Sequence, residues 1–402
     1  MNTRTIEGHP DKTVLDRIEG GYALMIDRAP FGEFLFVGSE SEGGQSRLIR
    51  LDTGEACTAT NEIGGMMHIL PTPGGAADTS AQYGPYIAAM GMYAPFIGQG
   101  AAVYMLYPGD TSNGAWNVSW SVQKLFDMPF VHRLGFLEVD GTNYLFVATV
   151  SHHKDYPEDW SRPGEVYVVD FDTARSTGRW DLTPMTGGLY RNHGMWVGQF
   201  DGEDALLVSG AEGLFAIRPD SKEGSTAGSE SRRDGPGATG DNAAGVHGAG
   251  FHLEPIITEE ISEMVPVDLD GDGVEEMVTI EPFHGHRLRV YKRSGSDGAV
   301  SLASGTWNPV WQTEDLSFAH GLNVIPWGTR SLTVVGNRRG GKELLGFDFA
   351  GLSREVRRFV LDENVGPTQI EPLGDRDEAS ARLVSCNQAA AEVSVYCFPV
   401  KE

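Results

Sequence analysis

Four histidines recur in similar local settings and are the residues of this chain best suited to chemistry. They are His68 (GGMMHIL), His132 (PFVHRLGF), His193 (YRNHGMWV) and His320 (SFAHGLNV), separated by 64, 61 and 127 residues. Each directly precedes an apolar run, a turn and a second apolar run. Imidazole is the commonest metal-ligand side chain and a frequent general base. A repeated fold that carries the same imidazole at equivalent corners would gather these rings at one place.

The elements that must position these histidines are predicted to be short strands. The apolar runs are rich in Val, Phe, Leu and Tyr and are bounded by Gly, Asp and Asn, which is typical of strands joined by turns. They group into seven units, which begin at Tyr22, Met66, Val131, Asn192, Glu263, Ala319 and Thr368. Repeats of this length with three or four strands each indicate an all-β fold, a seven-bladed β-propeller.

We therefore expect one propeller domain over residues 1–402, with 219–247 as a flexible loop because it is poor in apolar residues. Unit seven ends after its third strand, so the N-terminal segment around Thr13–Ile18 is expected to add the missing outer strand and close the ring. The competing interpretation is a pair of β-sandwiches, but nothing in sandwich architecture predicts one histidine per unit.

Two sets of polar positions are expected to meet around one mouth of the ring. The residue before the first strand of a blade lies on the same face as the loop between the second and third strands. The first set is His68, His132, His193 and His320, with Glu263 or Met264 in unit five and Thr368 or Gln369 in unit seven. The second set is His152, His153, Glu212, His284, His286, Arg338, Arg339 and Asn387.

Neutral imidazoles together with a carboxylate make a site for a divalent transition metal. With an open position, such a site polarises a carbonyl group and acidifies a neighbouring C–H. A free histidine would act as general base, and Tyr190, Tyr83 or Tyr156 as acid. Trp160 suits stacking on a sugar ring, and Arg338 with Arg339 suits a carboxylate or enediolate oxygen. The alternative is structural, with histidines that hydrogen-bond backbone at blade corners and aromatic rings that pack between blades.

The segment Asp268-Leu-Asp270-Gly-Asp272-Gly-Val-Glu275-Glu276 carries a different signal. Alternating carboxylates in a tight glycine-containing loop offer oxygens to a hard cation such as Ca²⁺. The loop lies between the first and second strands of unit five and is therefore expected on the face opposite the histidines. The alternative is an acidic turn without an ion.

Bulk composition restricts the partners and the compartment. The formal net charge of −25 argues against nucleic acid or an anionic membrane surface as the main partner. Three cysteines at no metal-ligand spacing fit a reducing compartment. The first residues contain no apolar signal region and no run reaches the length of a membrane span, so we expect a cytoplasmic protein that acts on small molecules.

Several segments resemble known propellers. DLDGDGVEEMVTI resembles the FG-GAP (VCBS-type) repeat, of which EVDGTNYLFV and QFDGEDALLV look like degenerate copies. IEPFHGHRLRVY, FAHGLNVIPWG and LDENVGPTQIEPL are similar to the propeller domain of aldos-2-ulose dehydratases, in short patches over units three to seven. The resemblance implies removal of water from an oxidised sugar on a seven-bladed propeller that carries a divalent metal. More distantly, propeller lyases eliminate uronic acids with His and Tyr, and with Arg that neutralises the carboxylate.

The leading hypothesis is a metal-dependent carbon–oxygen lyase, a dehydratase acting on a sugar or keto-sugar, with Zn or Mn at the histidine-rich mouth and Ca at the acidic loop. The predicted catalytic residues are His132, His153, Tyr190 and Arg338. The predicted metal ligands are His193, His284, His320 and Glu263 at the mouth, and Asp268, Asp270, Asp272 and Glu276 in the loop. The predicted substrate-binding residues are His68, His286, Trp160 and Arg339. The alternatives are a non-catalytic propeller that binds a glycan or protein on this face, and a lyase that eliminates uronates from a polysaccharide or oligosaccharide.

Overall fold

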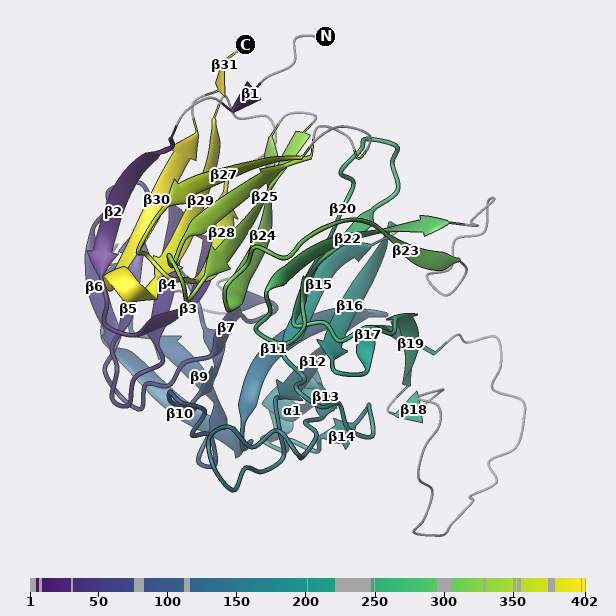
Figure 1. The fold of residues 1–402 in the computed structure, drawn as a ribbon. Coiled ribbons are helices and arrows are strands. Elements are labelled where there is room, and N and C mark those ends of the chain that lie inside the picture. The colour runs from purple at the N-terminus through teal and green to yellow at the C-terminus, as the bar shows by residue number, and fades with distance from the viewer. Residues whose placement is uncertain are drawn as a thin grey trace.

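The computed structural model shows a ring of β-sheets around a central axis (Figure 1). It describes residues 5–6, 9–29, 32–75, 83–111, 116–200, 202–220, 247–248, 250–294, 305–327, 330–349, 352, 356–374, 380–398 and 400–401. The loop predicted at 219–247 lies outside these residues except at its two ends. No helix in the described ranges is long and apolar enough to cross a membrane.

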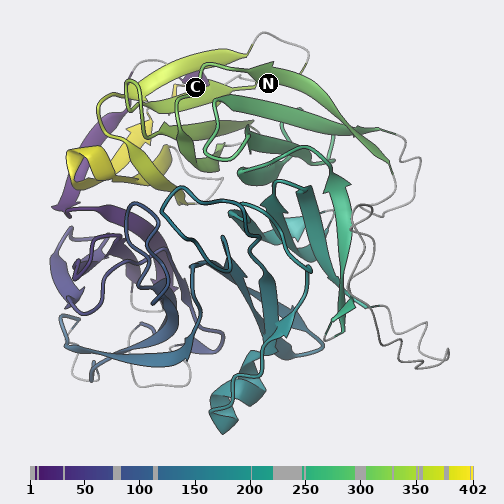
Figure 2. The ribbon, with the colours of Figure 1, turned by 60° about the horizontal axis from the view of Figure 1, so that its bottom comes forward.

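Seven antiparallel sheets form the blades in the described part of the chain, and Figure 2 shows them side by side around the ring. Blade 1 contains β3 (Gly21–Ala29), β4 (Gly32–Ser39), β5 (Ser46–Arg50) and β6 (Ala56–Thr60). Blade 2 contains β7 (His68–Pro71), β8 (Tyr86–Met90), β9 (Ala102–Pro108) and β10 (Trp120–Asp127). Blade 3 contains β11 (Val131–Val139), β12 (Thr142–Thr149), β13 (Val166–Asp170) and β14 (Thr183–Pro184).

The remaining blades follow the same order from the inner to the outer strand. Blade 4 contains β15 (Gly194–Phe200), β16 (Glu203–Gly210), β17 (Gly213–Pro219), β19 (Phe251–Ile257) and β18 (His247–Gly248). Blade 5 contains β20 (Glu263–Val267), β21 (Glu276–Glu281), β22 (Arg287–Ser294) and β23 (Thr306–Thr313). Blade 6 contains β24 (Ala319–Trp327), β25 (Arg330–Asn337), β26 (Leu344–Asp348) and β27 (Arg357–Asp362). The prediction of a seven-bladed, all-β propeller is confirmed.

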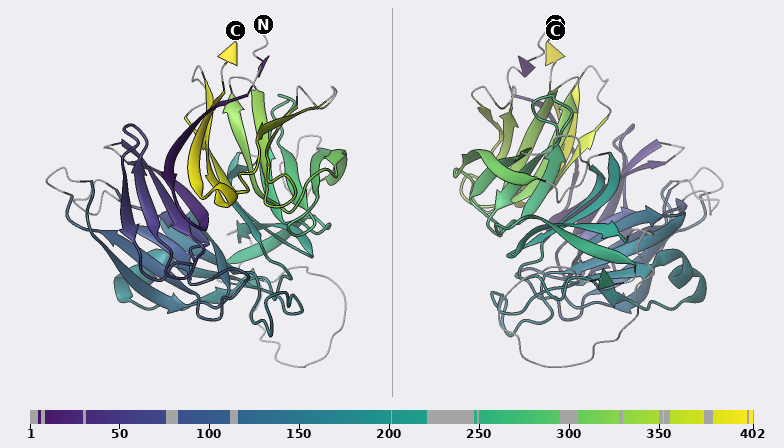
Figure 3. Two further views of the ribbon diagram at one scale, coloured as in Figure 1. Left: turned by 60° about the vertical axis from the view of Figure 1, so that its left-hand side comes forward. Right: turned by 90° about the vertical axis from the view of Figure 1, so that its right-hand side faces the viewer.

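Blade 7 joins the two ends of the chain and closes the ring. Its inner strands are β28 (Pro367–Leu373), β29 (Ala381–Asn387) and β30 (Glu392–Phe398), with η2 (Gln388–Ala390) between the last two. Its outer strand is β2 (Asp11–Arg17), which pairs antiparallel with β30, as predicted for the N-terminal segment. A short ribbon of β1 (Thr5–Ile6) and β31 (Val400–Lys401) extends from the same place, so the termini lie together in both views of Figure 3.

Turn residues fix how successive strands meet. Asp140 and Gly141 join β11 to β12 with φ values of 53° and 78°. Two consecutive positive φ values define the tight hairpin turn that Asp-Gly favours, because its twist matches that of the flanking strands. The described residues also include a short helix that the strand pattern did not predict, α1 (Phe171–Thr177). The Thr173 amide N–H donates to the Asp170 carboxylate at its start, and Gly178 ends it in the left-handed conformation.

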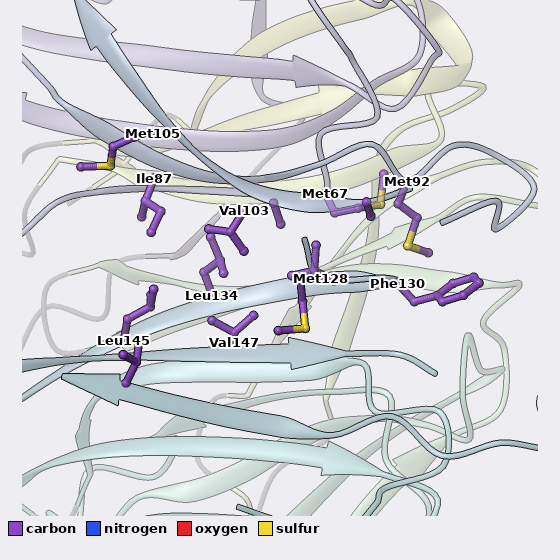
Figure 4. Packing of buried hydrophobic residues seen from close by; sticks show 14 of the residues in the cluster. Met67, Ile87, Met92, Val103, Met105, Met128, Phe130, Leu134, Leu145 and Val147 are labelled. Atoms are coloured by element: carbon purple, nitrogen blue, oxygen red, sulfur yellow. The ribbon is translucent and has the colours of Figure 1, made fainter. Parts of the chain in front are cut away.

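The hydrophobic core lies between neighbouring blades. Strands such as β8 and β20 are buried at every position because a blade covers each of their faces. Figure 4 shows the contact between blades 2 and 3, where Ile87 and Val103 of one sheet pack against Leu134, Leu145 and Val147 of the next. The inner strands are thereby held rigidly, and the residues at their first positions have defined places around the axis.

Candidate functional site

In four blades the inner strand begins with a β-bulge, and these bulges decide which side chains meet at the axis. In blade 1 the pairing passes from Gly21 opposite Ser39 to Ala23 opposite Gly38, so Tyr22 is the extra residue. The same one-residue skip occurs at His132, His320 and Thr368. A bulge redirects the extra side chain and is frequent next to active sites.

In the other three blades the register shows no skip, but a backbone hydrogen bond marks the equivalent position. The Met67 amide donates to the carbonyl of Ala89, the residue that pairs with His68. Equivalent bonds are formed by the amides of His193 and Ser262. We call the seven residues at this position the bulge layer: Tyr22, Met67, His132, His193, Ser262, His320 and Thr368. The residues that follow them form the channel layer: Ala23, His68, Arg133, Gly194, Glu263, Gly321 and Gln369.

The register corrects two expectations about the mouth. His68 does not share the slot of the other three histidines, because Met67 holds the equivalent position in blade 2 and His68 is the next residue, the first one paired in the strand. In blade 5 the slot belongs to Ser262 rather than to Glu263 or Met264. Spacing along the sequence cannot show a one-residue shift of this kind, since it is set by the pairing of the second strand.

Three histidines of the bulge layer converge, and we call them the imidazole cluster: His132, His193 and His320. One ring nitrogen of each lies within 4.8 Å of those of the other two. Each residue is 2% exposed. The ring centroids of His132 and His193 are 4.4 Å apart, and those of His193 and His320 are 5.1 Å apart.

Tyr22 completes this group from blade 1. Its Oη lies 2.6 Å from Nε2 of His320 and 3.1 Å from Nε2 of His132. Nδ1–H of His320 donates to the Thr368 carbonyl at 2.8 Å, so Nε2 of His320 is an acceptor and receives the Tyr22 hydroxyl. His132 then donates Nε2–H to Tyr22, and its buried Nδ1 has no hydrogen-bond partner among the described residues.

Hydrogen bonds at both ring nitrogens orient His193. Nδ1–H lies 3.2 Å from the Ser262 carbonyl and 2.9 Å from Oε1 of Glu263. Nε2 of His193 therefore accepts a hydrogen bond from Nε2–H of His284, at 3.2 Å. Glu263 also accepts from Arg133 at 2.6 Å, and this pairing holds the pKa of Glu263 below its usual value although burial acts to raise it.

Burial keeps the rings of His132, His284 and His320 uncharged. It lowers the pKa of His132, His284 and His320 well below the usual value for histidine, and the neighbouring His193 adds to the effect. Burial also raises the pKa of the Tyr22 hydroxyl far above its usual value. Neutral imidazole is the form that binds a metal ion, because its lone pair is then available.

The imidazole cluster fits a divalent transition metal by the chemistry of its donor set. Nε2 of His193 and of His320 carry the ring lone pairs, because their Nδ1–H groups donate to backbone carbonyls or a carboxylate. Metal-ligating histidines almost always donate the second ring N–H in this way, which fixes the tautomer and raises ligand basicity. Three imidazoles suit Zn, Mn, Fe or Cu ions.

A cavity of about 400 Å³, which we call the mouth cavity, lies beside the cluster on the side where the inner strands begin. Tyr22, His132 and His284 line it, together with three cationic residues, Arg338, Arg339 and Lys342. The Arg338 guanidinium donates to Glu40 at 3.3 Å and also to Gln388. The Arg339 guanidinium lies over the Phe318 ring, 4.4 Å from its centroid. The mouth cavity is thus lined both by cationic side chains and by imidazole rings.

His284 enters the mouth cavity from the loop between β21 and β22. Its backbone has a positive φ of 46°, and its ring stacks on that of Phe283 with centroids 3.9 Å apart. Phe283 in turn packs against Trp160, which also contacts the Phe96 ring and the Lys154 ammonium, the latter 3.0 Å from the indole centroid. This burial lowers the pKa of Lys154 to about 8. Trp160 therefore lies in an aromatic wall next to His284, and its stacking on a sugar ring stays a prediction.

On the other side of the cluster lies a second cavity of about 470 Å³, which we call the channel chamber. The Arg133–Glu263 pair and His68 face it, and Nδ1 of His68 accepts from the Leu134 amide at 3.1 Å. Burial and the positive charge of Arg133 lower the pKa of His68 to about 3. Glu371 also lines the chamber, and burial raises the pKa of its carboxyl group to about 7.

The structure brings some predicted site residues together and leaves others apart. His284, Arg338 and Arg339 line the mouth cavity, as expected from the loop geometry, and His132 rather than His284 completes the group of three imidazoles. Three further predicted residues do not line the mouth cavity: His153, Tyr190 and His286. The His153 side chain is 45% exposed and pairs with Asp155 at 3.1 Å, and Tyr190 is 40% exposed.

The acidic loop of blade 5 lies between β20 and β21, on the face opposite the mouth, as predicted. Carboxylate oxygens of Asp268, Asp270 and Glu276 lie within 4.8 Å of one another. The Lys292 ammonium lies among them, 2.6 Å from Asp270, 2.8 Å from Asp272 and 2.6 Å from Glu276. A Ca²⁺ ion at this loop stays a prediction, and it would have to compete with this ammonium group.

Comparison with known proteins supports the fold and leaves the family open. No family model matches the chain, and no curated protein matches it in sequence. A solved structure of BBS1N in complex with ARL6DN aligns at TM-score 0.53 and 11% identity over 99% of this chain and 98% of that one. A chain of the Mitotic Checkpoint Complex aligns at TM-score 0.51 and 11% identity over 100% and 94%. The Dos1 propeller aligns at TM-score 0.48 and 12% identity over 92% and 78%.

At these identities the likeness is one of fold alone. The molecule is thus a seven-bladed β-propeller with buried imidazoles at one end of its central channel. The aldos-2-ulose dehydratase and FG-GAP resemblances rest on the sequence patches alone. What the site does must be argued from its own side chains.

Proposed function

We propose that this chain is a metal-dependent carbon–oxygen lyase that acts on a sugar or keto-sugar in the mouth cavity. The observation that carries the proposal is the imidazole cluster, whose ring nitrogens converge within 4.8 Å beside a cavity of about 400 Å³. Small-molecule sites of this size are concave and hold a few convergent polar groups. The patches that resemble aldos-2-ulose dehydratases support the reaction class.

In this proposal His132, His193 and His320 hold the ion, Zn or Mn. The ion supplies a Lewis acid that polarises a carbonyl oxygen of the substrate. Glu263 fixes the orientation of His193 through Nδ1–H, and the Thr368 carbonyl does the same for His320. These contacts hold the rings in place before substrate enters, which limits the reorganisation needed for reaction.

His284 is assigned the role of general base because it lines the mouth cavity directly beside the cluster. It would take the proton from the carbon next to the carbonyl group, and the C–O bond one carbon further would break. The leaving hydroxyl group takes up that proton and departs as water, leaving a conjugated enone. Arg338 and Arg339 would bind the enolate oxygen or a carboxylate of the substrate.

The test combines metal analysis with turnover. The full-length protein is purified, its metal content is measured, and keto-sugars and uronates are supplied while near-ultraviolet absorbance of a conjugated product is followed. We expect bound metal, turnover that chelator abolishes, and loss of both in His193→Ala and His320→Ala. His284→Ala should retain metal while turnover falls by about 10²–10⁴-fold. His152→Ala, an exposed residue outside the mouth cavity, is the matched control.

A protein without bound metal and without turnover would overturn the proposal. Saturable binding of a glycan that needs no metal and forms no product would instead establish the non-catalytic alternative. Substrate preference also separates the two lyase hypotheses, because turnover of a uronate would depend on Arg338 and Arg339 more strongly than turnover of a neutral keto-sugar.

A further inference from the structure

We infer that Tyr22 is a fourth ligand of the ion held by the imidazole cluster, bound through its phenolate oxygen. This inference rests on the metal site of the proposed function and adds to it an oxygen donor from blade 1. Tyr22 occupies the same bulge position as His132 and His320, so the repeat geometry that gathers the imidazoles also delivers its hydroxyl group.

Distances place the Tyr22 oxygen in a ligand position. Its Oη lies 2.6 Å from Nε2 of His320 and 3.1 Å from Nε2 of His132. Ligand atoms on one first-row ion lie about 2.0–2.2 Å from the metal, which puts neighbouring ligands roughly 3 Å apart. A cation bound by Nε2 of both histidines is therefore within bonding reach of the phenol oxygen without rearrangement of the backbone. For His132 this requires the ring proton to move from Nε2 to Nδ1, which has no hydrogen-bond partner among the described residues.

The surroundings hold Tyr22 in this place. The residue is 4% exposed, and its carbonyl accepts a hydrogen bond from Oγ1 of Thr368 at 3.1 Å. The Arg338 guanidinium lies over the phenol ring, 5.6 Å from its centroid. In the described part of the chain the hydroxyl group bonds to imidazole nitrogens and to no carboxylate or backbone group.

Binding through phenolate is an acid–base exchange without a redox change. The O–H bond of Tyr22 breaks, its proton goes to solvent, and an oxygen–metal bond forms. The resulting set of three nitrogens and one oxygen carries one negative charge, so it reduces the net charge of a divalent ion to +1. The donor set therefore favours a hard or borderline ion such as Mn²⁺, Fe³⁺ or Cu²⁺ over a soft one.

A spectroscopic experiment tests this directly. The full-length protein is stripped with chelator and loaded separately with Cu²⁺ and Fe³⁺, both of which give visible charge-transfer absorption when bound by phenolate. We expect a visible band and tyrosinate vibrations in resonance Raman spectra. Zn²⁺, which gives no visible band, should produce a tyrosinate difference spectrum in the near ultraviolet.

Two variants assign the signal. Tyr22→Phe should lose the band and bind metal at least about 10-fold more weakly, while its melting temperature without metal stays near that of the parent protein. Tyr93→Phe is the matched control, because Tyr93 lines the same cavity but donates to the Ile63 carbonyl at 3.2 Å. It should keep both the band and the affinity. If Tyr22→Phe does not fold, the spectra of the parent protein and of Tyr93→Phe still decide the matter.

The outcomes separate this inference from the proposed function. Failure of the parent protein to bind any of the three ions would overturn the metal site itself. Stoichiometric binding without a phenolate band in the parent protein, or with an identical band in Tyr22→Phe, would leave the imidazole site intact and overturn the role of Tyr22.

Discussion

Removing the charge of Glu263 perturbs a buried ion pair that contacts the imidazole cluster. Glu263 and Arg133 form an ion pair at 2.6 Å directly below the imidazole cluster, with side chains that are 11% and 10% exposed. Glu263→Gln keeps an amide oxygen in the place of Oε1, so hydrogen bonds from Arg133 and His193 can persist. The substitution thus removes the charge while it retains the shape, and leaves a guanidinium group without compensation in a nearly buried place.

The magnitude follows from the burial of the pair. Breaking a buried ion pair by removal of one partner costs about 3–5 kcal/mol, because the remaining charge is desolvated without a counter-charge. We expect the lower end for Glu263→Gln, since the hydrogen bonds survive. Arg133→Met together with Glu263→Gln removes both charges and should recover most of the loss. The double-mutant cycle should then give a coupling energy of about 2–3 kcal/mol.

Urea unfolding followed by tryptophan fluorescence and circular dichroism measures these differences, with m-values as the check that the same surface unfolds. The pKa of Glu263 is lower in the folded protein than its usual value, so its contribution is complete above about pH 4.3 and is lost as the pH falls through the folded value. The gap between the parent protein and Glu263→Gln should therefore be constant from pH 5 to pH 8, and should narrow in more acidic solution. A coupling energy below about 0.5 kcal/mol at pH 7 would refute the reasoning.

Three further perturbations test other parts of the molecule. Glu371→Gln should gain stability relative to the parent protein as the pH rises from 5 to 8, because the raised folded-state pKa of about 7 makes ionisation of this carboxyl group costly. A difference in melting temperature between the variant and the parent protein that does not change with pH would contradict this. Lys292→Met should lower the melting temperature, because Asp270, Asp272 and Glu276 would then repel one another in the acidic loop. Ca²⁺ should raise the melting temperature of this variant more than that of the parent protein. Equal responses would show that Lys292 does not substitute for the ion. Deletion of residues 1–20 removes β2 and should lower the melting temperature sharply, because it opens the ring and exposes the edge of β30. A peptide of residues 9–20 should restore the melting temperature. An unchanged melting temperature in the deletion variant would show that blade 7 does not need its N-terminal strand.

Much of the fold could be predicted from the sequence because its information is local. Runs of β-formers bounded by Gly, Asp and Asn mark the strands, and the Asp140–Gly141 turn is readable as a hairpin signal. The missing fourth strand of the last unit implied closure by the N-terminus, which the β2–β30 pairing confirms. Helix α1 was missed because it is too short to show amphipathic periodicity, although Asp170 and Gly178 are recognisable cap residues in retrospect.

The candidate site could be predicted only as far as the repeat phase allows. Histidine spacing predicts that His132, His193 and His320 lie at one place. In blade 2, however, the equivalent position belongs to Met67 and not to His68, which is the next residue along the chain. The repeat phase also places Tyr22 in the equivalent slot of unit one, which the structure confirms, but a search for repeated imidazoles gives its phenol no role in the site. Side chains in equivalent bulges share geometry and not residue type. The chemistry of this channel is therefore best sought by asking what occupies each bulge, and that question joins Tyr22 to the three histidines and separates His68 from them.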